Sequence, residues 1–497
     1  MALATLTGAP ETGSVSAGQA LSLRAFLERL ERESAVDVVH VTEAVNPDRF
    51  EVTAVLQRLE DLDRFPLVVF DRPTALDGQS SGIPLVTNVF ASRARCARAL
   101  GLGPEHEGLE LSLEYARREA RRLAPAVIPR EQAPVKAIVQ RGDEVDLKQF
   151  PVVRHHRMDG GPYIDMTPVM RDPDSGAYNV AFQRNQVKGP RKLGIHMSPR
   201  HNWQIARKYE QAGLPTPVAV VVGHHPAFYI GALNVSPFDA DDYEVIGAIA
   251  NQPLRLTPSE TWGDDFLVPA DAEIVIEGEI PPGVREVEGP FGEFPGTYGP
   301  QRVRWVIDVK AVTRRRDAIY QDTFVGHREV SILGAFPKEG SLYNRIKAVV
   351  PGVRGVHLPN SGVGRFHAYI SLDKRFEGEP QQAALIALGN VDFLKHVIVV
   401  DADDIDVYRE DQVLWALATR VQAGRDVQVL CGVKGSALDP SQDEEGAGDK
   451  LIVDATRPLR HPFEARIEVP RDAVAAVDLA RLIPPDQLAR LGLGPLS

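Results

Sequence analysis

The chain has 497 residues, of which 43% are hydrophobic and 25% charged, a composition typical of a globular protein of about three domains. The formal net charge of −12 argues against a nucleic-acid-binding protein and against docking on an anionic membrane. The sequence contains neither an apolar run of about 18–20 residues, as a membrane span needs, nor a Cys-x-x-Cys pair. Its two cysteines, Cys96 and Cys431, lie far apart, so we expect no disulfide framework, no thiolate zinc site and a cytoplasmic protein.

The first part of the chain alternates between helical and strand patterns. Residues 1–18 are small and polar and predict a disordered leader. Ser22 is predicted to cap a helix whose apolar face is made by Leu23, Phe26, Leu27 and Leu30. Further helices are expected near 52–59 and 92–100, and strands at 36–41, 67–70 and 85–86. This alternation predicts an N-terminal α/β domain over residues 19–125.

Four arginines lie close together on the last helix of this domain, at positions 117, 118, 121 and 122. Because Glu114 and Glu119 interleave with them, we interpret the arginines as a solvated helix face and not as a binding patch. Pro125, Pro129 and Pro134 then indicate a linker.

Short strand patterns separated by Gly and Pro turns dominate residues 126–326. The strands are expected at 135–140, 163–170, 178–187, 217–223, 272–278, 302–312 and 319–325. Within one of them, Ile274 and Ile276 alternate with Glu273 and Glu277, which predicts a strand with one wetter face. Many short strands with few helices favour a closed or split β-barrel.

Helical patterns return in residues 327–497, which we predict to be a C-terminal α/β domain. Helices are expected at 342–350, 381–388 and 411–421, and the apolar run 396–400 predicts a strand covered on both faces. Residues 440–450 are acidic and contain glycine, which predicts a mobile loop. The tail at 474–491 has helical spacing that is broken at Pro484 and Pro485, and we expect it to pack on a partner subunit.

The segment 288–293 holds two carboxylates in a stiff turn. Glu288 and Glu293 flank Gly289, Pro290 and Gly292, residue types that fix unusual backbone angles. Two acids held close together compete for protons, and burial raises the pKa of at least one, as a proton donor at neutral pH requires. The alternative is a surface turn with two solvated glutamates.

Arg184 ends a strand-like segment, 179–184. If its side chain points inward it needs a carboxylate partner, because an unpaired buried guanidinium is costly, and Glu288 is the candidate. The alternation of the strand is equally compatible with Arg184 facing solvent. Other cations that could meet an anionic group are Lys188, Arg302, Arg304 and Arg328, although no spacing argument places them at the site.

A mixed oxygen and nitrogen donor set is available for a divalent cation. Asn179 and His201 each offer one neutral ligand atom, and Asp241, Asp242 and Glu244 offer carboxylates. Such a set suits Mn²⁺ or Mg²⁺ better than zinc. The spacing is long and irregular, so a capping histidine with a solvated acidic loop is the competing interpretation.

The chain resembles the UbiD-like family of decarboxylases that use prenylated FMN. The resemblance runs from about Phe26 to the end and rests on six segments taken together, 179–184, 198–201, 288–293, 399–407, 414–420 and 435–440. It implies a central split β-barrel that binds the flavin and a C-terminal domain through which the chains form a homodimer or a higher homo-oligomer.

The resemblance also implies roles for the matching residues. Arg184, Glu288 and Glu293 align with the family's catalytic set, with Glu293 as the proton donor to the carbon that loses CO2. Asn179, His201 and Asp242 align with the ligands of Mn²⁺ or Mg²⁺, which bridges to the cofactor phosphate, and K⁺ is a possible further ion. Since the family usually has Glu at the third position and Asp242 is one methylene shorter, Glu244 is an alternative ligand. The residues that the resemblance places at the cofactor are Asn179, Val180, Ala181, Phe182, Gln183, Arg184, Arg200, His201 and Lys395.

The implied reaction is a reversible, non-oxidative decarboxylation of an α,β-unsaturated or (hetero)aromatic acid through a covalent adduct with prenylated FMN. Loss of CO2 leaves an electron pair that no side chain can hold, so a cofactor is required. His327 follows the last barrel strand and is the candidate substrate contact, with a structural histidine as the alternative. A flavin prenyltransferase would supply the cofactor. The rival functions are a non-catalytic flavin-binding scaffold and a metal-dependent hydrolase that uses Asp242 and His201.

Overall fold

The computed structural model describes residues 21–34, 37–442 and 446–491. The leader predicted for residues 1–18 lies outside the described residues, and so does part of the loop predicted at 440–450. Met1–Thr456 form one compact unit and Arg457–Ser497 another. Among the described residues, no helix combines the length and the apolar character that crossing a bilayer requires.

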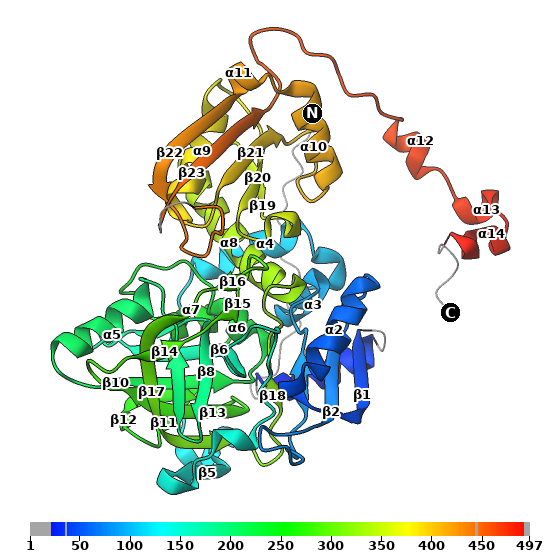
Figure 1. The fold of residues 1–497 in the computed structure, drawn as a ribbon. Coiled ribbons are helices and arrows are strands. Elements are labelled where there is room, and N and C mark those ends of the chain that lie inside the picture. The colour runs from blue at the N-terminus through cyan, green and yellow to red at the C-terminus, as the bar shows by residue number, and fades with distance from the viewer. Residues whose placement is uncertain (1–20, 35–36, 443–445, 492–497) are drawn as a thin grey trace. The chain divides into compact units, whose positions relative to one another are not determined.

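A four-stranded sheet organises the N-terminal region (Figure 1). Its strands, in order, are β1 (Val38–Val45), β2 (Leu67–Pro73), β3 (Leu85–Thr87) and β18 (Tyr320–Gln321). The helices are α1 (Leu23–Glu33), α2 (Glu51–Asp61), α3 (Arg93–Ala99) and α4 (Leu109–Glu119). The Ser22 hydroxyl accepts a hydrogen bond from the Ala25 amide at 3.2 Å and the four predicted apolar positions of α1 are buried, which confirms this helix.

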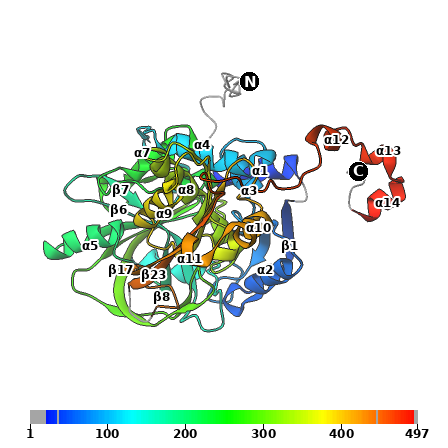
Figure 2. The same cartoon turned by 90° about the horizontal axis from the view of Figure 1, so that it is seen from above.

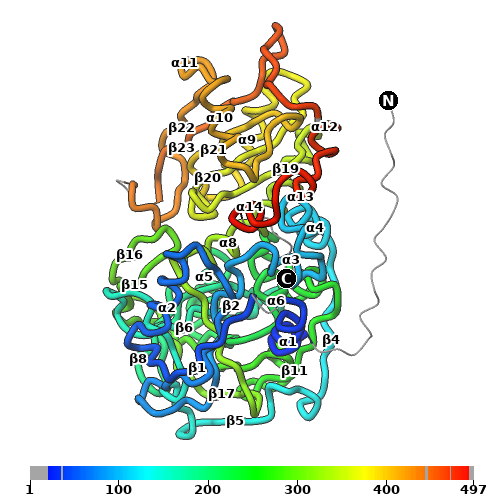
Figure 3. Tube along the Cα trace, turned by 90° about the vertical axis from the view of Figure 1, so that its right-hand side faces the viewer, coloured from blue at the N-terminus to red at the C-terminus, as the bar shows by residue number. Residues whose placement is uncertain are grey.

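Six antiparallel strands close into a barrel in the middle of the chain, which confirms the predicted fold class (Figure 3). They follow the order β10 (Thr216–Val222), β13 (Ile274–Ile280), β17 (Arg302–Arg314), β9 (Lys192–Ile195), β8 (Gln183–Gly189) and β6 (Tyr163–Arg171), and β6 pairs again with β10. Strands β5 (Ile138–Arg141), β7 (Tyr178–Val180) and β14 (Glu286–Glu288) pair at the edges.

Smaller elements complete this region. Helices α5 (His201–Gln211), α6 (Pro226–Gly231) and α7 (Asp242–Ala250) lie between barrel strands in the sequence. A separate sheet contains β12 (Gly263–Pro269), β11 (Arg255–Ser259) and β4 (Ala126–Val127), and β15 (Phe291–Gly292) pairs with β16 (Tyr298–Gly299).

Three local predictions in the first two regions are wrong. The segment predicted as a strand at 319–325 contributes only β18, which pairs with β3 of the N-terminal sheet and not with the barrel. Glu277 does not face water: it is fully buried and accepts hydrogen bonds from Ser259 Oγ at 2.5 Å and the Thr261 amide at 2.9 Å. Arg118, which was predicted to lie on a solvated helix face, is also buried. Its guanidinium donates to the carbonyls of Ile249 and Leu100 at 2.7 and 2.8 Å.

The C-terminal region has a five-stranded sheet in the order β19 (Val353–His357), β20 (His367–Leu372), β21 (His396–Asp401), β23 (Ala447–Ala455) and β22 (Val427–Lys434). The strand predicted at 396–400 is confirmed as the central β21, which pairs in parallel with β20 and β23. Val399 packs in the cluster that contains α9 (Glu379–Asn390), whereas Val400 packs with α10 (Glu410–Arg420), so the two helices cover opposite faces (Figure 2). The short α11 (Ala423–Asp426) precedes β22.

Helix α8 (Arg328–Lys347) lies between the barrel and the C-terminal sheet in Figures 1 and 3. It is much longer than the helix predicted at 342–350. The prediction missed its first half because Gly334, Pro337 and Gly340 are unfavourable in helices and interrupt the helical pattern. Gly340 has a packing reason: a Cβ there would lie 2.7 Å from the Ser112 carbonyl oxygen of α4.

The second unit, residues 457–497, contains α12 (Arg471–Ala475), α13 (Leu479–Leu482) and α14 (Pro485–Arg490). The predicted helix break at Pro484 and Pro485 is confirmed, since it separates α13 from α14. The predicted domain limits, 19–125, 126–326 and 327–497, stay predictions.

Candidate active site

The turn between Glu288 and Glu293 joins β14 to the β15–β16 hairpin. Gly289 has φ +89°, and a Cβ there would approach the Pro300 carbonyl oxygen to 3.2 Å. At Gly292, a Cβ would lie only 2.3 Å from His156 Nδ1. Both glycines are therefore needed for close packing, and the turn holds the two acids in fixed positions.

Arg184 of β8 joins the two acids. Its Nε and Nη2 donate to the two carboxylate oxygens of Glu288 at 2.9 and 2.7 Å, and its Nη1 donates to Glu293 Oε1. Arg184 and Glu288 are buried, so the solvent-facing alternatives for the arginine and for the acidic turn are both wrong. Tyr163 Oη donates to Glu288 Oε1 at 3.1 Å, and the Phe291 ring centroid lies 5.6 Å from the guanidinium.

The two acids differ in their surroundings. Glu288 is bound through both oxygens, whereas only one Glu293 oxygen meets Arg184. Burial raises the pKa of Glu293, although Arg184 opposes this effect, and the charge of Glu288 raises the pKa further. The site therefore combines a fixed bidentate ion pair with one acid whose pKa is raised.

A group of polar and aromatic side chains surrounds this turn, and the sequence did not single it out. Asp165 of β6 stands directly opposite Arg184, and burial raises its pKa to about 7. His155 Nε2 lies 2.8 Å from Asp322 Oδ2. The adjacent pair His155 and His156, just before the Asp-Gly-Gly segment at 159–161, is the signal that could have marked this region.

His327, the predicted substrate contact, lies in this group. Its ring is nearly parallel to that of His156, with centroids 5.7 Å apart, and it stacks on Phe324 at 3.6 Å. Its Nδ1 lies 2.6 Å from Glu60 Oε2 of α2. Because His156 packs over Gly292, His327 is connected to the acidic turn through one intervening ring.

Two of the predicted metal ligands are in contact, and the third binds the backbone next to one of them. His201 Nδ1 lies 3.1 Å from Asn179 Oδ1, and Asp242 Oδ2 accepts a hydrogen bond at 2.8 Å from the amide of Val180, the residue after Asn179. Burial raises the pKa of Asp242 to about 7. Its carboxylate has no cationic side chain within ion-pair distance among the described residues.

The neighbouring acids differ from Asp242. Asp241 caps α7 by accepting a hydrogen bond from the Tyr243 amide at 2.8 Å, so its side chain has a structural role. Glu244 is only half-buried. Among the described residues, no group of three or more His, Cys, Asp and Glu side chains is placed to hold a metal, so any site here depends on the amide oxygen of Asn179.

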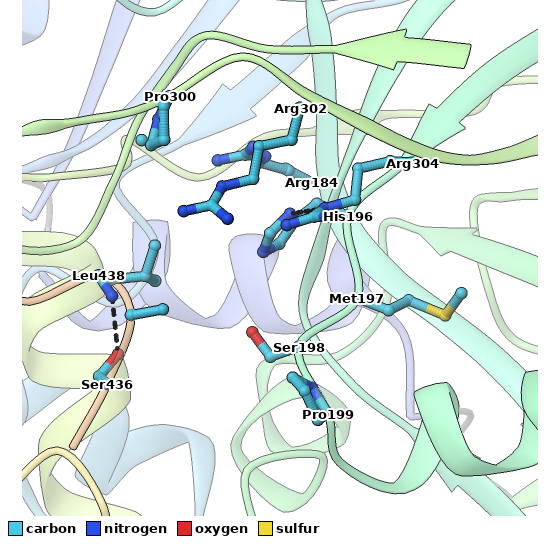
Figure 4. A pocket seen from close by; sticks show the side chains of 12 residues that line it. Arg184, His196, Met197, Ser198, Pro199, Pro300, Arg302, Arg304, Ser436 and Leu438 are labelled. Atoms are coloured by element: carbon cyan, nitrogen blue, oxygen red, sulfur yellow. Dashed lines mark hydrogen bonds between the residues drawn. The ribbon is translucent and has the colours of Figure 1, made fainter. Parts of the chain in front are cut away.

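A cavity of about 70 Å³ opens beside Arg184 (Figure 4). Two of the candidate cations, Arg302 and Arg304, line it, and Arg304 Nε donates to His196 Nδ1 at 3.1 Å. Its other lining residues come from 196–199, 299–300 and 436–438. The 435–440 segment therefore lies against the barrel. The other two candidate cations do not line this cavity. Lys188 pairs with Glu286 at 3.2 Å, and Arg328 stacks over Phe65 at 4.4 Å.

The remaining predicted cofactor residues come from three parts of the chain, β7 and β8, the start of α5 and the start of β21. Val180 belongs to β7, Ala181 and Phe182 connect β7 to β8, and Gln183 Oε1 accepts a hydrogen bond from Asn202 at 3.2 Å. Arg200 precedes α5 and stacks over Phe393 at 4.7 Å. Lys395 Nζ pairs with Asp439 at 2.9 Å, which ties the start of β21 to the 435–440 segment.

Comparison with protein-family models matches nearly the whole chain. The N-terminal domain, the Rift-related domain and the C-terminal domain of 3-octaprenyl-4-hydroxybenzoate carboxy-lyase match residues 27–127, 126–328 and 331–455.

Individual relatives agree with these family models. The anhydromevalonate phosphate decarboxylase of Methanothermobacter thermautotrophicus is 38% identical over 64% of this chain and 75% of that protein. The phenolic acid decarboxylase of Sedimentibacter hydroxybenzoicus is 33% identical over 90% and 95%. Among solved structures, the UbiD-class enzyme HmfF from Pelotomaculum thermopropionicum in complex with FMN matches with a TM-score of 0.84 and 38% identity, covering 93% of this chain and 100% of that one. The chain belongs to the UbiD family of carboxy-lyases, the decarboxylases predicted from its sequence.

Proposed function

We propose that the protein catalyses the reversible, non-oxidative decarboxylation of an α,β-unsaturated or (hetero)aromatic carboxylic acid with prenylated FMN, and that Glu293 is the proton donor. The observation that carries this proposal is the arrangement of Arg184 between two acids of different character, one fixed by two hydrogen bonds and one with a raised pKa. A flavin-binding scaffold would not need such a donor, and a metal-dependent hydrolase would not need it beside a flavin.

The residues present fit a flavin phosphate and a divalent cation. Asp242 is a buried carboxylate without an ion-pair partner in the described part of the chain, and it binds the amide of Val180 next to the neutral donor Asn179. One amide oxygen, one imidazole nitrogen and one carboxylate suit Mn²⁺ or Mg²⁺ and leave coordination positions for a phosphate oxygen. We place the flavin ring on the side of Arg184 where the cavity lined by His196 and Arg304 opens.

When bound, prenylated FMN supplies the electron sink that no side chain offers. The chain's own residues then position the proton donor and set its pKa. Arg184 and Glu288 hold each other in place and orient the donor. Burial raises the pKa of Glu293, as a proton donor requires.

The proton balance follows from these positions. The bond between the substrate carbon and its carboxylate breaks, CO2 leaves, and that carbon takes the proton from Glu293. In the carboxylation direction, the Glu293 carboxylate removes the proton from the same carbon. Solvent returns the proton after each turnover.

The substrate class rests on the relatives, which include decarboxylases of phenolic acids, and on the aromatic stack of His156, Phe324 and His327 near the acids. We propose that His327 tunes the choice of acid. The proposal includes a flavin prenyltransferase as cofactor supplier and a homodimer or a higher homo-oligomer in solution.

The test is co-expression with a flavin prenyltransferase, followed by a screen of furoic, cinnamic and benzoic acids for CO2 release. The proposal predicts release that depends on prenylated flavin. A scaffold would bind flavin without turnover, and a hydrolase would be active without flavin, so either result would replace the proposal.

A further inference from the structure

Two neighbouring cationic groups, Arg365 beside Phe294 and Lys338 of α8, have no acidic ion-pair partner among the described residues. The guanidinium of Arg365, in the loop before β20, makes no hydrogen bond or ion pair with any described residue, and its Nη1 is buried. Lys338 of α8 is buried, and its Nζ donates only to the Gly334 carbonyl oxygen of the same helix, at 3.0 Å. Buried cations are normally paired with an anion, because removing an unpaired charge from water is expensive.

Packing holds the Arg365 guanidinium in place without an acid. Its Cζ lies 4.3 Å from the ring centroid of Phe294, the residue that follows Glu293, and 5.9 Å from that of Phe393. A Cβ on Gly334 would lie 2.5 Å from Arg365 Nη2, so this glycine makes room for the guanidinium. Aromatic rings and a glycine therefore fix the group, which leaves its N–H donors available for a ligand.

The electrostatic surroundings favour an anion. Burial lowers the pKa of Lys338 well below its usual range, and the positive charges of Arg365 and Arg200 lower it further. Burial also lowers the pKa of Arg365 to about 10, which Glu293 opposes. Glu293 forms its ion pair with Arg184, and its charge acts on Arg365 only at longer range, without an ion pair between these two described residues.

We propose that Arg365 and Lys338 form an anion-binding subsite beside Glu293, which takes a carboxylate or phosphate group of a ligand. A guanidinium held against aromatic rings binds either group through paired N–H donors, and the neighbouring Lys338 amine adds a further donor. The two sources available in the proposed reaction are the carboxylate of the acid substrate and the phosphate of the flavin. The identity of the anion rests on the proposed function, whereas the subsite itself does not.

The first test uses stability of the flavin-free, full-length protein, measured as Tm. Replacing an unpaired buried cation by an apolar side chain of similar length removes an unfavourable burial, so Arg365→Met and Lys338→Met should each raise Tm. If Arg365 served only to support the fold through its aromatic contacts, Arg365→Met would lower Tm. Arg354→Met is the matched control, because Arg354 lies on the exposed surface of the same region, paired with Asp373 at 2.7 Å.

The second test identifies the anion by fluorescence titration of the same variants. FMN and riboflavin differ only in the phosphate, so loss of the phosphate contact would weaken FMN binding to Arg365→Met by ~10-fold or more and leave riboflavin binding unchanged. If the substrate carboxylate is the anion, the variant instead keeps FMN binding and raises KM for 2-furoate by a similar factor. Arg365→Lys should recover part of either effect.

Either binding result supports the subsite. Unchanged FMN binding and unchanged KM in both Arg365→Met and Lys338→Met would overturn it. Failure of the proposed function would give a different result. The wild-type protein would then release no CO2 with any acid, whatever the variants bind.

Discussion

Arg184 and Glu288 are 104 residues apart in the sequence and form a bidentate ion pair, with N···O distances of 2.9 and 2.7 Å, inside the protein. Tyr163 adds a hydrogen bond to the same carboxylate. Since both partners are buried, neither charge is screened by water, and the orientation of Arg184 toward Glu293 depends on this pair.

Breaking this pair from one side should destabilise the fold. Arg184→Met leaves the Glu288 carboxylate buried without its cation, and we expect a loss of about 3–5 kcal/mol in the free energy of unfolding, measured with urea. The double variant Arg184→Met with Glu288→Gln removes both charges and should recover a large part of that loss. A double variant as unstable as the single one would show that the ion pair is not what holds the two segments.

The raised pKa of Glu293 predicts the pH dependence of the reaction. Decarboxylation needs the protonated acid, so kcat should fall as the pH rises through the pKa of Glu293. Arg184 lowers this pKa, and Arg184→Met should therefore move the falling limb to higher pH. The measurement is a pH profile of kcat under saturating acid. A falling limb at the same pH in both proteins would assign it to another group.

The identity of the third metal ligand, Asp242 or Glu244, can be tested directly. Mn²⁺ should raise the Tm of the wild-type protein, because the cation restores the charge of the buried Asp242. Asp242→Asn should lose this stabilisation, whereas Glu244→Gln should keep it. The opposite pattern would identify Glu244 as the ligand, and no Mn²⁺ effect in any of the three proteins would remove the metal site.

His327 is expected to influence which acid is used. His327→Ala opens space beside Phe324 and His156, so the ratio of kcat/KM for 2-furoate and benzoate should change by about tenfold. Glu60→Gln is the matched control: it weakens the hydrogen bond to His327 and keeps the ring. An unaltered substrate profile in His327→Ala would make this histidine a structural residue.

Local signals in the sequence predicted the elements well, and long-range partners poorly. The α1 cap, the central strand β21 and the barrel follow from spacing over a few residues. The orientation of Arg184 does not, because alternation along β8 is equally compatible with both faces until Glu288 is known to lie opposite. Glu277 shows the same limit, since its acidic side chain is hydrogen-bonded by Ser259 of β11 and by Thr261 in the turn that follows β11.

Part of the site could not be predicted from the sequence, for a physical reason. His156 becomes a neighbour of the acidic turn only because Gly292 lacks a side chain there, and Asp165 faces Arg184 only through the register of β6 and β8. Neither relation leaves a pattern in the local sequence. The length of α8 was missed because its proline and glycines are unfavourable in isolated helices, whereas in the fold Gly340 packs against α4 and Gly334 against Arg365.

The most direct test of the central claim is CO2 release by protein loaded with prenylated FMN, compared between the wild type and Glu293→Gln, with bound cofactor measured in both by absorbance and mass. Glutamine keeps the shape of the side chain and cannot donate the acid proton. We predict that Glu293→Gln retains the cofactor and loses at least about a hundredfold in kcat. Turnover at the wild-type rate in a fully loaded Glu293→Gln protein would contradict the account.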